Sequence, residues 1–184
     1  MKQVIAAILI VLAARPAPAT ELPPIYTTGD ATVCFTTGNK STIGGDCGAV
    51  LVAEIAKAER ELLVQAYNFT EPRIIAAIIA AHRRGVLVTV ILDKISPSQR
   101  GEGADPVHDA GIPTFIDRKP KIAHNKVVVI DQTTVVTGSF NFSTNAGCCN
   151  AENLLVIHRP ALAVAYAENF ARRPAVSVEY LTKP

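Results

Sequence analysis

Residues 86–92 constrain the fold of this 184-residue chain more than any other segment. They spell Val-Leu-Val-Thr-Val-Ile-Leu, an almost continuous run of β-branched and apolar side chains. A strand of that composition is buried on both faces, as in a sheet that helices cover on both sides. The segment therefore predicts a central strand inside a layered domain.

Strands and helices are expected to alternate along the rest of the chain. Apolar spacing and helix start and stop signals predict helices over 47–60, 70–84, 105–110 and 160–172, with Thr70 capping the second one. Short β-rich runs predict further strands over 32–35, 61–69, 112–116, 124–130, 133–137 and 152–158. This order is typical of an α/β domain. A tight turn at Asp131-Gln132 would join two antiparallel strands, so we expect a mixed, largely parallel β-sheet sandwiched by helices.

The N-terminus has the pattern of a secretory signal peptide. A basic start precedes an apolar core of about 11 residues and a small-x-small ending at Ala17 and Ala19. We predict cleavage after Ala19, a periplasmic or secreted mature protein, a linker over 20–31 and one domain over 32–184. An uncleaved anchor is the alternative; it is disfavoured because a spanning helix needs roughly 20 apolar residues and Arg15 interrupts the run.

The four cysteines are Cys34, Cys47, Cys148 and Cys149. An exported protein meets an oxidising compartment, where disulfides persist. Three pairings are possible, and the sequence does not choose between them. A Cys34–Cys47 bridge would close a Gly-rich loop, whereas the adjacent Cys148 and Cys149 are expected not to bond each other because such a ring is strained. Neither a Cys-x-x-Cys nor a zinc-type His spacing occurs, so no metal is expected.

A set of chemically active residues occurs once, between positions 124 and 141: His124, Lys126, Asp131, Gly138, Ser139 and Asn141. Side chains alternate along a strand, which places His124 and Lys126 on one face, and Ser139 and Asn141 again share parity just after Gly138. Asp131 comes seven positions after His124, an odd offset, so it should face away from the imidazole. A turn-stabilising role suits Asp131 better than catalysis, although it stays among the candidates.

These groups suit the chemistry of a phosphodiester. A neutral imidazole can attack an anionic phosphate without charge repulsion, and Lys126 supplies positive charge for the non-bridging oxygens. Ser139 and Asn141 add neutral donors, and donors aimed at developing charge are a large catalytic effect. The leaving oxygen also needs a proton, for which a second histidine is a natural source. His82, His108 and His158 do not lie in a comparable sequence setting.

The spacing of these residues resembles the His-x-Lys-(x)4-Asp-(x)6-Gly-Ser-x-Asn motif of the phospholipase D superfamily, and every motif position matches. Four further stretches, 33–37, 64–70, 85–93 and 151–157, are similar to small secreted bacterial nucleases of that superfamily. Together they cover most of residues 32–172. The resemblance implies the fold of that superfamily.

The resemblance also implies roles for individual residues. His124 would be the nucleophile that forms a phosphohistidine, and Lys126, Asn141 and Ser139 would bind the phosphate. Glu152 matches a downstream acidic residue that hydrogen-bonds the histidine. Members with a single motif build their site across a homodimer axis, so we expect a homodimer in which His124 of the partner subunit protonates the leaving oxygen. No cofactor is expected, because Lys126 from both subunits supplies the positive charge.

Three functions remain open at this point. The first is a metal-independent endonuclease that cuts DNA, with RNA as a further substrate and with little sequence preference. The second is a phospholipase D-type hydrolase of phospholipids, and the third is a nucleic-acid binder without catalysis. Small size and one motif copy favour the nuclease, and the intact His124 and Lys126 count against the binder. The net charge of +2 fits any of them.

Residues around the motif have weaker signals. Arg118, Lys119 and Lys121 could contact nucleic-acid phosphates or simply form a solvated loop. Tyr67 and Asp93 lie at strand ends, where they could reach the site or have structural roles.

Overall fold

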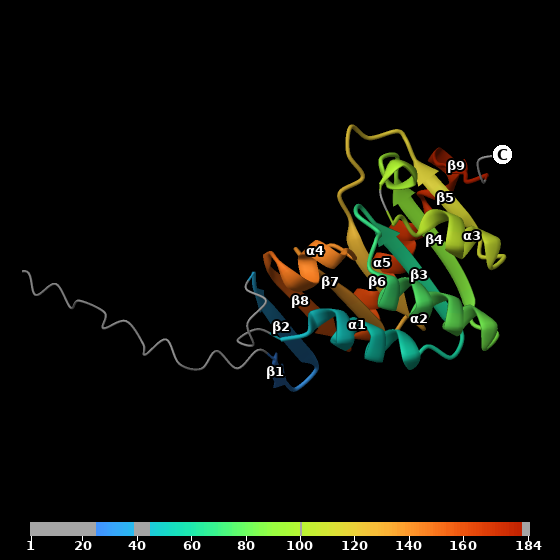
Figure 1. The fold of residues 1–184 in the computed structure, drawn as a ribbon. Coiled ribbons are helices and arrows are strands. Elements are labelled where there is room, and N and C mark those ends of the chain that lie inside the picture. The colour runs from blue at the N-terminus through green and yellow to red at the C-terminus, as the bar shows by residue number, and fades with distance from the viewer. Residues whose placement is uncertain (1–24, 39–44, 100, 182–184) are drawn as a thin grey trace, which may run out of the picture.

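A nine-stranded mixed sheet forms the centre of the structure, a computed structural model that describes residues 25–38, 45–99 and 101–181. The predicted signal peptide and its cleavage point lie outside these residues. The strand order across the sheet is β1-β2-β8-β7-β6-β3-β4-β5-β9 (Figure 1). The strands are β1 (Ile25–Thr28), β2 (Ala31–Thr37), β3 (Glu61–Ala66), β4 (Leu87–Asp93), β5 (Thr114–Asp117), β6 (Lys126–Ile130), β7 (Thr134–Gly138), β8 (Ala151–Ile157) and β9 (Val178–Glu179).

Antiparallel pairs outnumber parallel ones in this sheet. Only the β3–β4 and β4–β5 pairs are parallel, and the other six neighbouring pairs are antiparallel. The mixed α/β architecture is confirmed, but the expected predominance of parallel strands is wrong. The reason is connectivity: among neighbouring strands, crossover helices link only β3 to β4 and β4 to β5, whereas β1–β2 and β6–β7 are joined by short turns that force antiparallel pairing.

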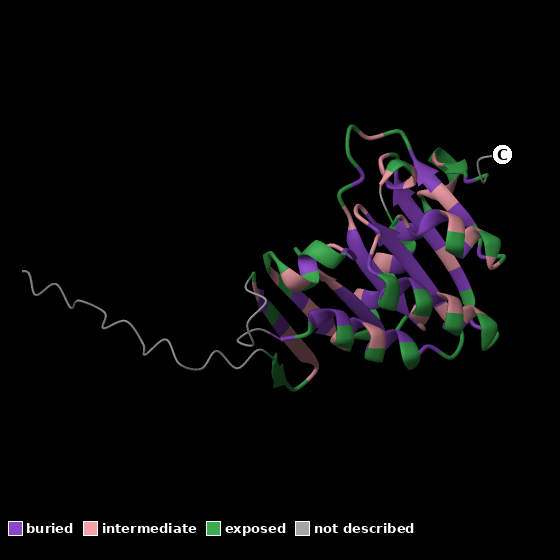
Figure 2. Cartoon of the chain, in the orientation of Figure 1, coloured by how far each residue is buried: buried purple, intermediate pink, exposed green. Residues whose placement is uncertain are grey.

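Helices cover both faces of the sheet, as expected. They are α1 (Cys47–Ala56), α2 (Pro72–Arg83), α3 (Ala104–Asp109), α4 (Thr144–Cys148) and α5 (Pro160–Ala171), with short 3-10 turns at Ser96–Ser98 and Pro174–Val176. In Figure 1, α1, α2 and α3 lie in front of the sheet and α5 lies behind it. The buried central strands between these layers stand out in Figure 2.

Two hydrophobic cores result from this layering. The larger core joins α1, α2 and α3 to one face, and the smaller core packs α5 against the other. Strand β6 serves both, because Val128 and Ile130 face the larger core while Val127 and Val129 face the smaller one. The segment predicted at 86–92 behaves the same way in β4: Val90 and Leu92 belong to one core and Ile91 to the other. Continuous apolar runs are therefore strands buried on both faces.

The structure differs from the expected elements at two early positions. Strand β1 lies within the segment expected to be a linker, where it pairs with β2 from Ile25 against Cys34 to Thr28 against Ala31. Thr70 was expected to cap α2, but the helix begins one residue later, with Glu71 at the N-cap and Pro72 as the first helical residue. Proline suits that position because the first turn leaves its N–H groups unpaired in any case.

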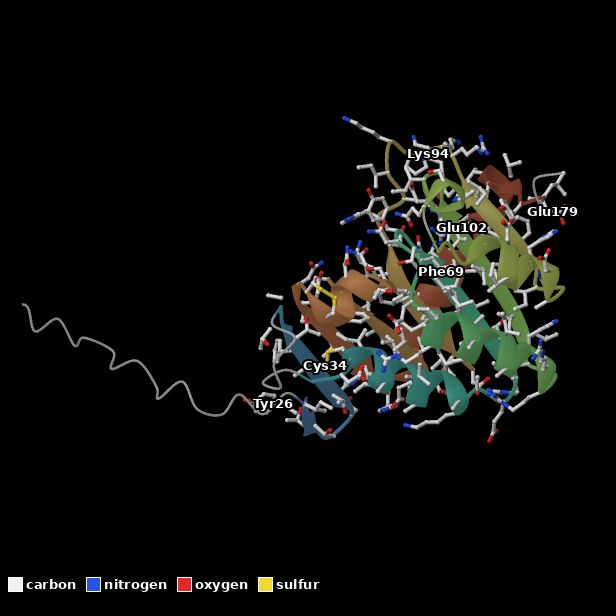
Figure 3. The ribbon with its side chains drawn as sticks, viewed as in Figure 1. Tyr26, Cys34, Phe69, Lys94, Glu102 and Glu179 are labelled. Carbon is white, nitrogen blue, oxygen red and sulfur yellow. A yellow bond between two sulfur atoms is a disulfide. The ribbon has the colours of Figure 1, made fainter. Side chains whose placement is uncertain are left out.

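Both disulfides are present among the described cysteines. Cys34 bonds to Cys47, which ties β2 to the start of α1. Cys148 bonds to Cys149 at the end of α4, so the expectation that these neighbours would not pair is wrong. The residues lie where the chain leaves a short helix, and Cys149 has a non-helical backbone there that lets the two sulfurs meet. Both bonds are drawn in yellow in Figure 3.

Candidate active site

All motif residues except Asp131 lie at one end of the sheet strands because of strand direction. Strands β6 and β8 begin at this end, and β3, β7 and β2 end there. The register pairs Ala66 at the end of β3 with Lys126 at the start of β6, and Gly138 at the end of β7 with Leu154 in β8. Residues that flank strands far apart in sequence therefore lie close together at this end of the sheet.

His124 and Lys126 lie together around the ring of Tyr67. The imidazole of His124 is exposed and meets the Tyr67 ring edge-on, with ring centroids 4.6 Å apart. The Lys126 ammonium lies 5.1 Å from the centre of the same ring and donates a hydrogen bond to the His124 carbonyl at 3.1 Å. His124 precedes β6 rather than belonging to it, so this common contact, and not strand alternation, brings the two groups together. Tyr67 is the residue of this group whose role the sequence left undecided.

Lys126 is a buried cation, with only 6% of its surface exposed. Burial lowers its pKa because the charged form loses hydration, while the negative charge of Glu152 acts in the opposite direction. The ammonium lies over an aromatic ring and bonds to a backbone carbonyl, so it is held in place but only weakly neutralised. Such a group can stabilise an anionic ligand strongly.

Gly138 and Ser139 bring the end of β7 against the start of β8. Gly138 has φ +150°, and a Cβ there would lie 2.3 Å from the carbonyl oxygen of Asn153, so a side chain is excluded. The backbone N–H groups of Ser139 and Phe140 both donate to that same oxygen at 3.1 Å. The motif glycine is thus explained by a close approach of two backbones.

Glu152 has partners other than the one that the resemblance implied. Its carboxylate accepts hydrogen bonds from Ser139 Oγ at 2.5 Å and from Asn150 Nδ2 at 3.0 Å. Within the described ranges, no hydrogen bond joins this carboxylate to the His124 imidazole. Glu152 therefore holds Ser139 and Asn150 and supplies negative charge near Lys126 in the isolated subunit.

Asn141 is positioned by the two phenylalanines beside it. Phe140 and Phe142 are fully buried in the larger core, which turns Ser139 and Asn141 toward the other side, as their shared parity predicted. Asn141 is half-buried, and its Oδ1 atom is buried without a hydrogen-bond partner within residues 25–38, 45–99 and 101–181.

Asp131 lies at the opposite end of β6 and is not part of the site. Its carboxylate accepts backbone N–H bonds from Glu59, Arg60 and Glu61 at 3.0, 2.8 and 2.8 Å. Burial acts to raise the pKa of Asp131, but these backbone donors outweigh it and the pKa is lowered overall. With φ values of +52° and +56°, Asp131 and Gln132 form the predicted tight turn. The structure therefore places Asp131 away from His124 and Lys126, unlike the other catalytic candidates, and its bonds support the turn-stabilising interpretation.

Asp93 anchors the loop that carries His124. This buried carboxylate, 1% exposed, accepts the backbone N–H of Ala123 at 2.6 Å and that of Ile95 at 2.9 Å. The sequence offered only its place at the end of an apolar strand as a signal. Asp93 fixes the residue next to the nucleophile candidate and is a positioning residue.

The loop before His124 carries exposed positive charge. Arg118, Lys119 and Lys121 are exposed, and Lys94 joins them by donating from its Nζ to the Pro120 carbonyl at 3.2 Å. Figure 3 shows Lys94 at this end of the sheet. An anion approaching His124 therefore meets cations along the loop.

No group of three His, Cys, Asp or Glu side chains that could hold a metal ion occurs in the part of the chain that the structure describes. In the same part, no helix is long and apolar enough to cross a membrane.

Comparison with known proteins assigns the chain to a family. The family described as "Cardiolipin synthase, PLD-like domain" matches residues 51–173. A protein named phospholipase D from Rickettsia typhi is 39% identical over 135 residues, which cover 73% of this chain and 66% of that relative. The phospholipase D of Rickettsia prowazekii is 40% identical, with 71% and 64% covered. The chain thus spans slightly less than two thirds of the length of these relatives.

Solved structures of known proteins have a similar fold. A phospholipase D family member, Nuc from Salmonella typhimurium, superposes with a TM-score of 0.74 at 30% identity, covering 83% of this chain and all of that one. NucT from Helicobacter pylori superposes with a TM-score of 0.72 at 21% identity, covering 82% and 98%. The family match and the identity to the Rickettsia proteins show that this chain belongs to the phospholipase D superfamily.

Proposed function

We propose that this protein is a metal-independent endonuclease that hydrolyses DNA, and RNA as a further substrate, through a phosphohistidine intermediate on His124. The observation that carries the proposal is the pairing of an exposed imidazole with a buried ammonium on one aromatic ring. The imidazole is accessible to a large substrate. The ammonium lies where it can bind the phosphate that the imidazole attacks.

The proposed reaction has two displacements. In the first, an imidazole nitrogen of His124 forms a P–N bond while the P–O bond to the leaving group breaks, and the leaving oxygen takes a proton from a general acid. In the second, that acid, now a base, removes a proton from water, which attacks phosphorus and breaks the P–N bond. Lys126 and the amide of Asn141 stabilise the negative charge that builds on the phosphate oxygens in both steps.

The general acid is proposed to come from a second copy of the chain. His82 lies in α2, His108 contacts Tyr180, and His158 hydrogen-bonds with Thr134; none of these positions belongs to the site residues. His124 of the partner subunit would serve if two exposed sites face each other across a two-fold axis. The exposure of His124 supports this arrangement.

Nucleic acid is favoured over phospholipid by the surroundings of the site. The exposed cations at 118–121 and at Lys94 suit a polyanion that extends beyond one phosphate. The match to Nuc covers that whole chain. Phospholipid hydrolysis remains the second candidate because the Rickettsia relatives are named phospholipase D.

The Cys34–Cys47 bridge supports a proposal about location. Disulfides persist in oxidising compartments and are rare in the cytosol. Together with the N-terminal pattern, the bridge supports export of the mature protein to the periplasm or beyond.

Purified protein incubated with plasmid DNA and, separately, with phosphatidylcholine vesicles tests the function. Both reactions contain EDTA. We expect the plasmid to be nicked and degraded while the lipid stays intact. Lipid hydrolysis with intact plasmid would establish the second candidate, and a strict need for a divalent ion would contradict the two-histidine reaction.

Mixing wild-type subunits with His124→Ala subunits tests the shared site. If each site needs both imidazoles, activity follows the square of the wild-type fraction after subunit exchange, about one quarter at equal mixing. Independent sites would leave about one half under the same conditions. Sedimentation velocity on each sample establishes whether dimers form, and an active monomer would contradict the arrangement.

A further inference from the structure

A polar pocket of about 270 Å³ adjoins the phosphate-binding residues. Every side chain that lines it carries an amide or a hydroxyl group: Asn68, Thr70, Gln99, Asn141, Ser143, Asn145 and Asn150. We call it the amide pocket. The lining has neither a charged nor an apolar side chain, which sets it apart from the cationic loop beside His124.

The amide pocket is built by backbone contacts between two distant segments. Phe69 and Phe142 form an isolated bridge, and the N–H groups of Thr70 and Glu71 both donate to the Phe142 carbonyl at 2.8 and 3.0 Å. Phe69 and Phe142 are fully buried, and Figure 3 shows Phe69 between the ribbons. The frame of the pocket is therefore fixed by the larger core.

Two buried oxygens of the lining have no hydrogen-bond partner among the residues that the structure describes. They are Gln99 Oε1 and Asn141 Oδ1. The other end of the Gln99 amide is engaged, because its Nε2 donates to Asn68 Oδ1 at 2.5 Å, so the orientation of the Gln99 carbonyl is set. Buried polar atoms are nearly always paired, and two unpaired acceptors in one pocket call for a ligand that brings donors.

The amide pocket is joined to the phosphate-binding residues in two ways. Asn141 belongs to both: its amino end can reach a phosphate while its carbonyl end lies in the lining. Asn150 belongs to the lining and donates to Glu152, which in turn accepts from Ser139. A substrate group bound in the pocket would therefore belong to the part of the substrate next to the phosphate.

We propose that the amide pocket binds the nucleobase next to the scissile phosphate, through base N–H donors to Gln99 Oε1 and Asn141 Oδ1. This inference rests on the proposed nuclease function and extends it to a base subsite. A neutral lining of amides suits a base edge, which side chains recognise on unpaired strands by hydrogen bonds. An acyl chain would find no apolar partner in it. Adenine and cytosine carry an exocyclic amino donor where thymine carries a carbonyl, so the pocket favours these two bases over thymine.

The test is a Gln99→Met variant, which keeps the length of the side chain and removes the acceptor. Its matched control is Gln132→Met, on the exposed turn at the opposite end of β6. Steady-state kinetics are measured on single-stranded oligo(dC), on oligo(dT), and on bis(p-nitrophenyl) phosphate, a diester without a base. We expect Gln99→Met to raise KM for oligo(dC) about tenfold with kcat and the small diester unaffected. Wild type should prefer oligo(dC) to oligo(dT), and the control should match wild type.

Three results would overturn the inference. An equal loss on all substrates would mean that Gln99 only supports the site. Unchanged KM for oligo(dC) would mean that the pocket does not contact the base. Faster cleavage of phosphatidylserine vesicles than of either oligonucleotide, lost in Gln99→Met, would assign the pocket to a lipid headgroup. Wild type that hydrolyses the small diester but no oligonucleotide would instead show that the proposed nuclease function itself has failed.

Discussion

The two ends of strand β6 carry residues of the same motif but have opposite chemical characters. At the Asp131 end, three backbone N–H groups saturate a carboxylate and Arg60 donates to the Asp131 carbonyl at 3.0 Å. At the His124 end, an imidazole is exposed, a lysine is buried, and the Asn141 oxygen has no partner in the described part of the chain. At the Asp131 end, the polar groups find their hydrogen-bond partners within the chain. At the His124 end, polar groups are left that a ligand can bind.

This difference separates a structural role from the proposed catalytic role within one motif. A saturated group stabilises the native chain and has little left to offer a substrate. A buried polar group without a partner weakens the fold, and both such a group and an exposed imidazole are free to bind or react with a ligand. Substitutions at the His124 end should therefore change activity, and those at the Asp131 end should change stability.

His124→Ala should give the largest effect. Removal of the nucleophile is expected to lower kcat at least about 10⁴-fold, because no other group in the site can form the P–N bond. The exposed imidazole has little packing to lose, so the thermal midpoint should stay within a few degrees of wild type. His158→Ala, an exposed histidine at the other end of β8, is the control. Activity near wild type would remove His124 from the reaction.

Lys126→Met should lower kcat about 10²–10³-fold. Its effect on folding should be neutral or favourable, since a buried charge is replaced by an apolar side chain of similar length. Burial lowers the pKa of Lys126, so the charged form is less stable in the folded state than in the unfolded state. Any stability gain of the variant should therefore shrink as pH rises toward the ordinary lysine pKa of 10.5. Urea unfolding at several pH values measures this, with Lys57→Met as the exposed control. A strongly destabilised variant would argue for a structural role.

Asp131→Asn should reduce stability and spare catalysis. The amide can accept fewer of the three backbone bonds, which should cost about 2 kcal/mol of unfolding free energy while kcat stays within about twofold. The lowered pKa of Asp131 means that its contribution is present above 3.8 and is lost as pH falls through the folded-state value. The gap between variant and wild type should close under acid, as followed by thermal melts. Asp109→Asn on α3 is the control, and a large loss of kcat at full folding would reverse our assignment.

Ser139→Ala should show the smallest effect, and it should affect both activity and stability. The hydroxyl donates to Glu152 and accepts from the Asn153 backbone at 3.0 Å, so it contributes to both the site and the fold. We expect about a fivefold loss of kcat and about 1 kcal/mol of stability. Ser177→Ala, which loses one hydrogen bond remote from the motif, should change stability alone. If Ser139→Ala lost activity alone, Ser139 would have only a role in the site; if it lost stability alone, Ser139 would have only a structural role.

Most of the fold could be predicted because its signals are local. Apolar runs identified β4 and β6, and Gly85 with the spacing before it identified α2. The errors came from non-local or geometric facts. Strand β1 has no alternating pattern and exists because β2 offers it an edge. The preference for parallel pairs failed because periodicity reports which face is buried but not the direction of the neighbouring strand.

The sequence by itself determined which functional groups the protein has and their spacing along the chain. It identified the motif, the shared parity of Ser139 and Asn141, and the turn at Asp131, because alternation and turn chemistry act over a few residues. Only the tertiary structure decided that Tyr67 joins His124 to Lys126, that Asp93 holds the loop, and that Gln99 meets Asn141 across a pocket. These contacts join segments up to 60 residues apart, and their positions depend on strand order and register, which arise when the whole sheet packs.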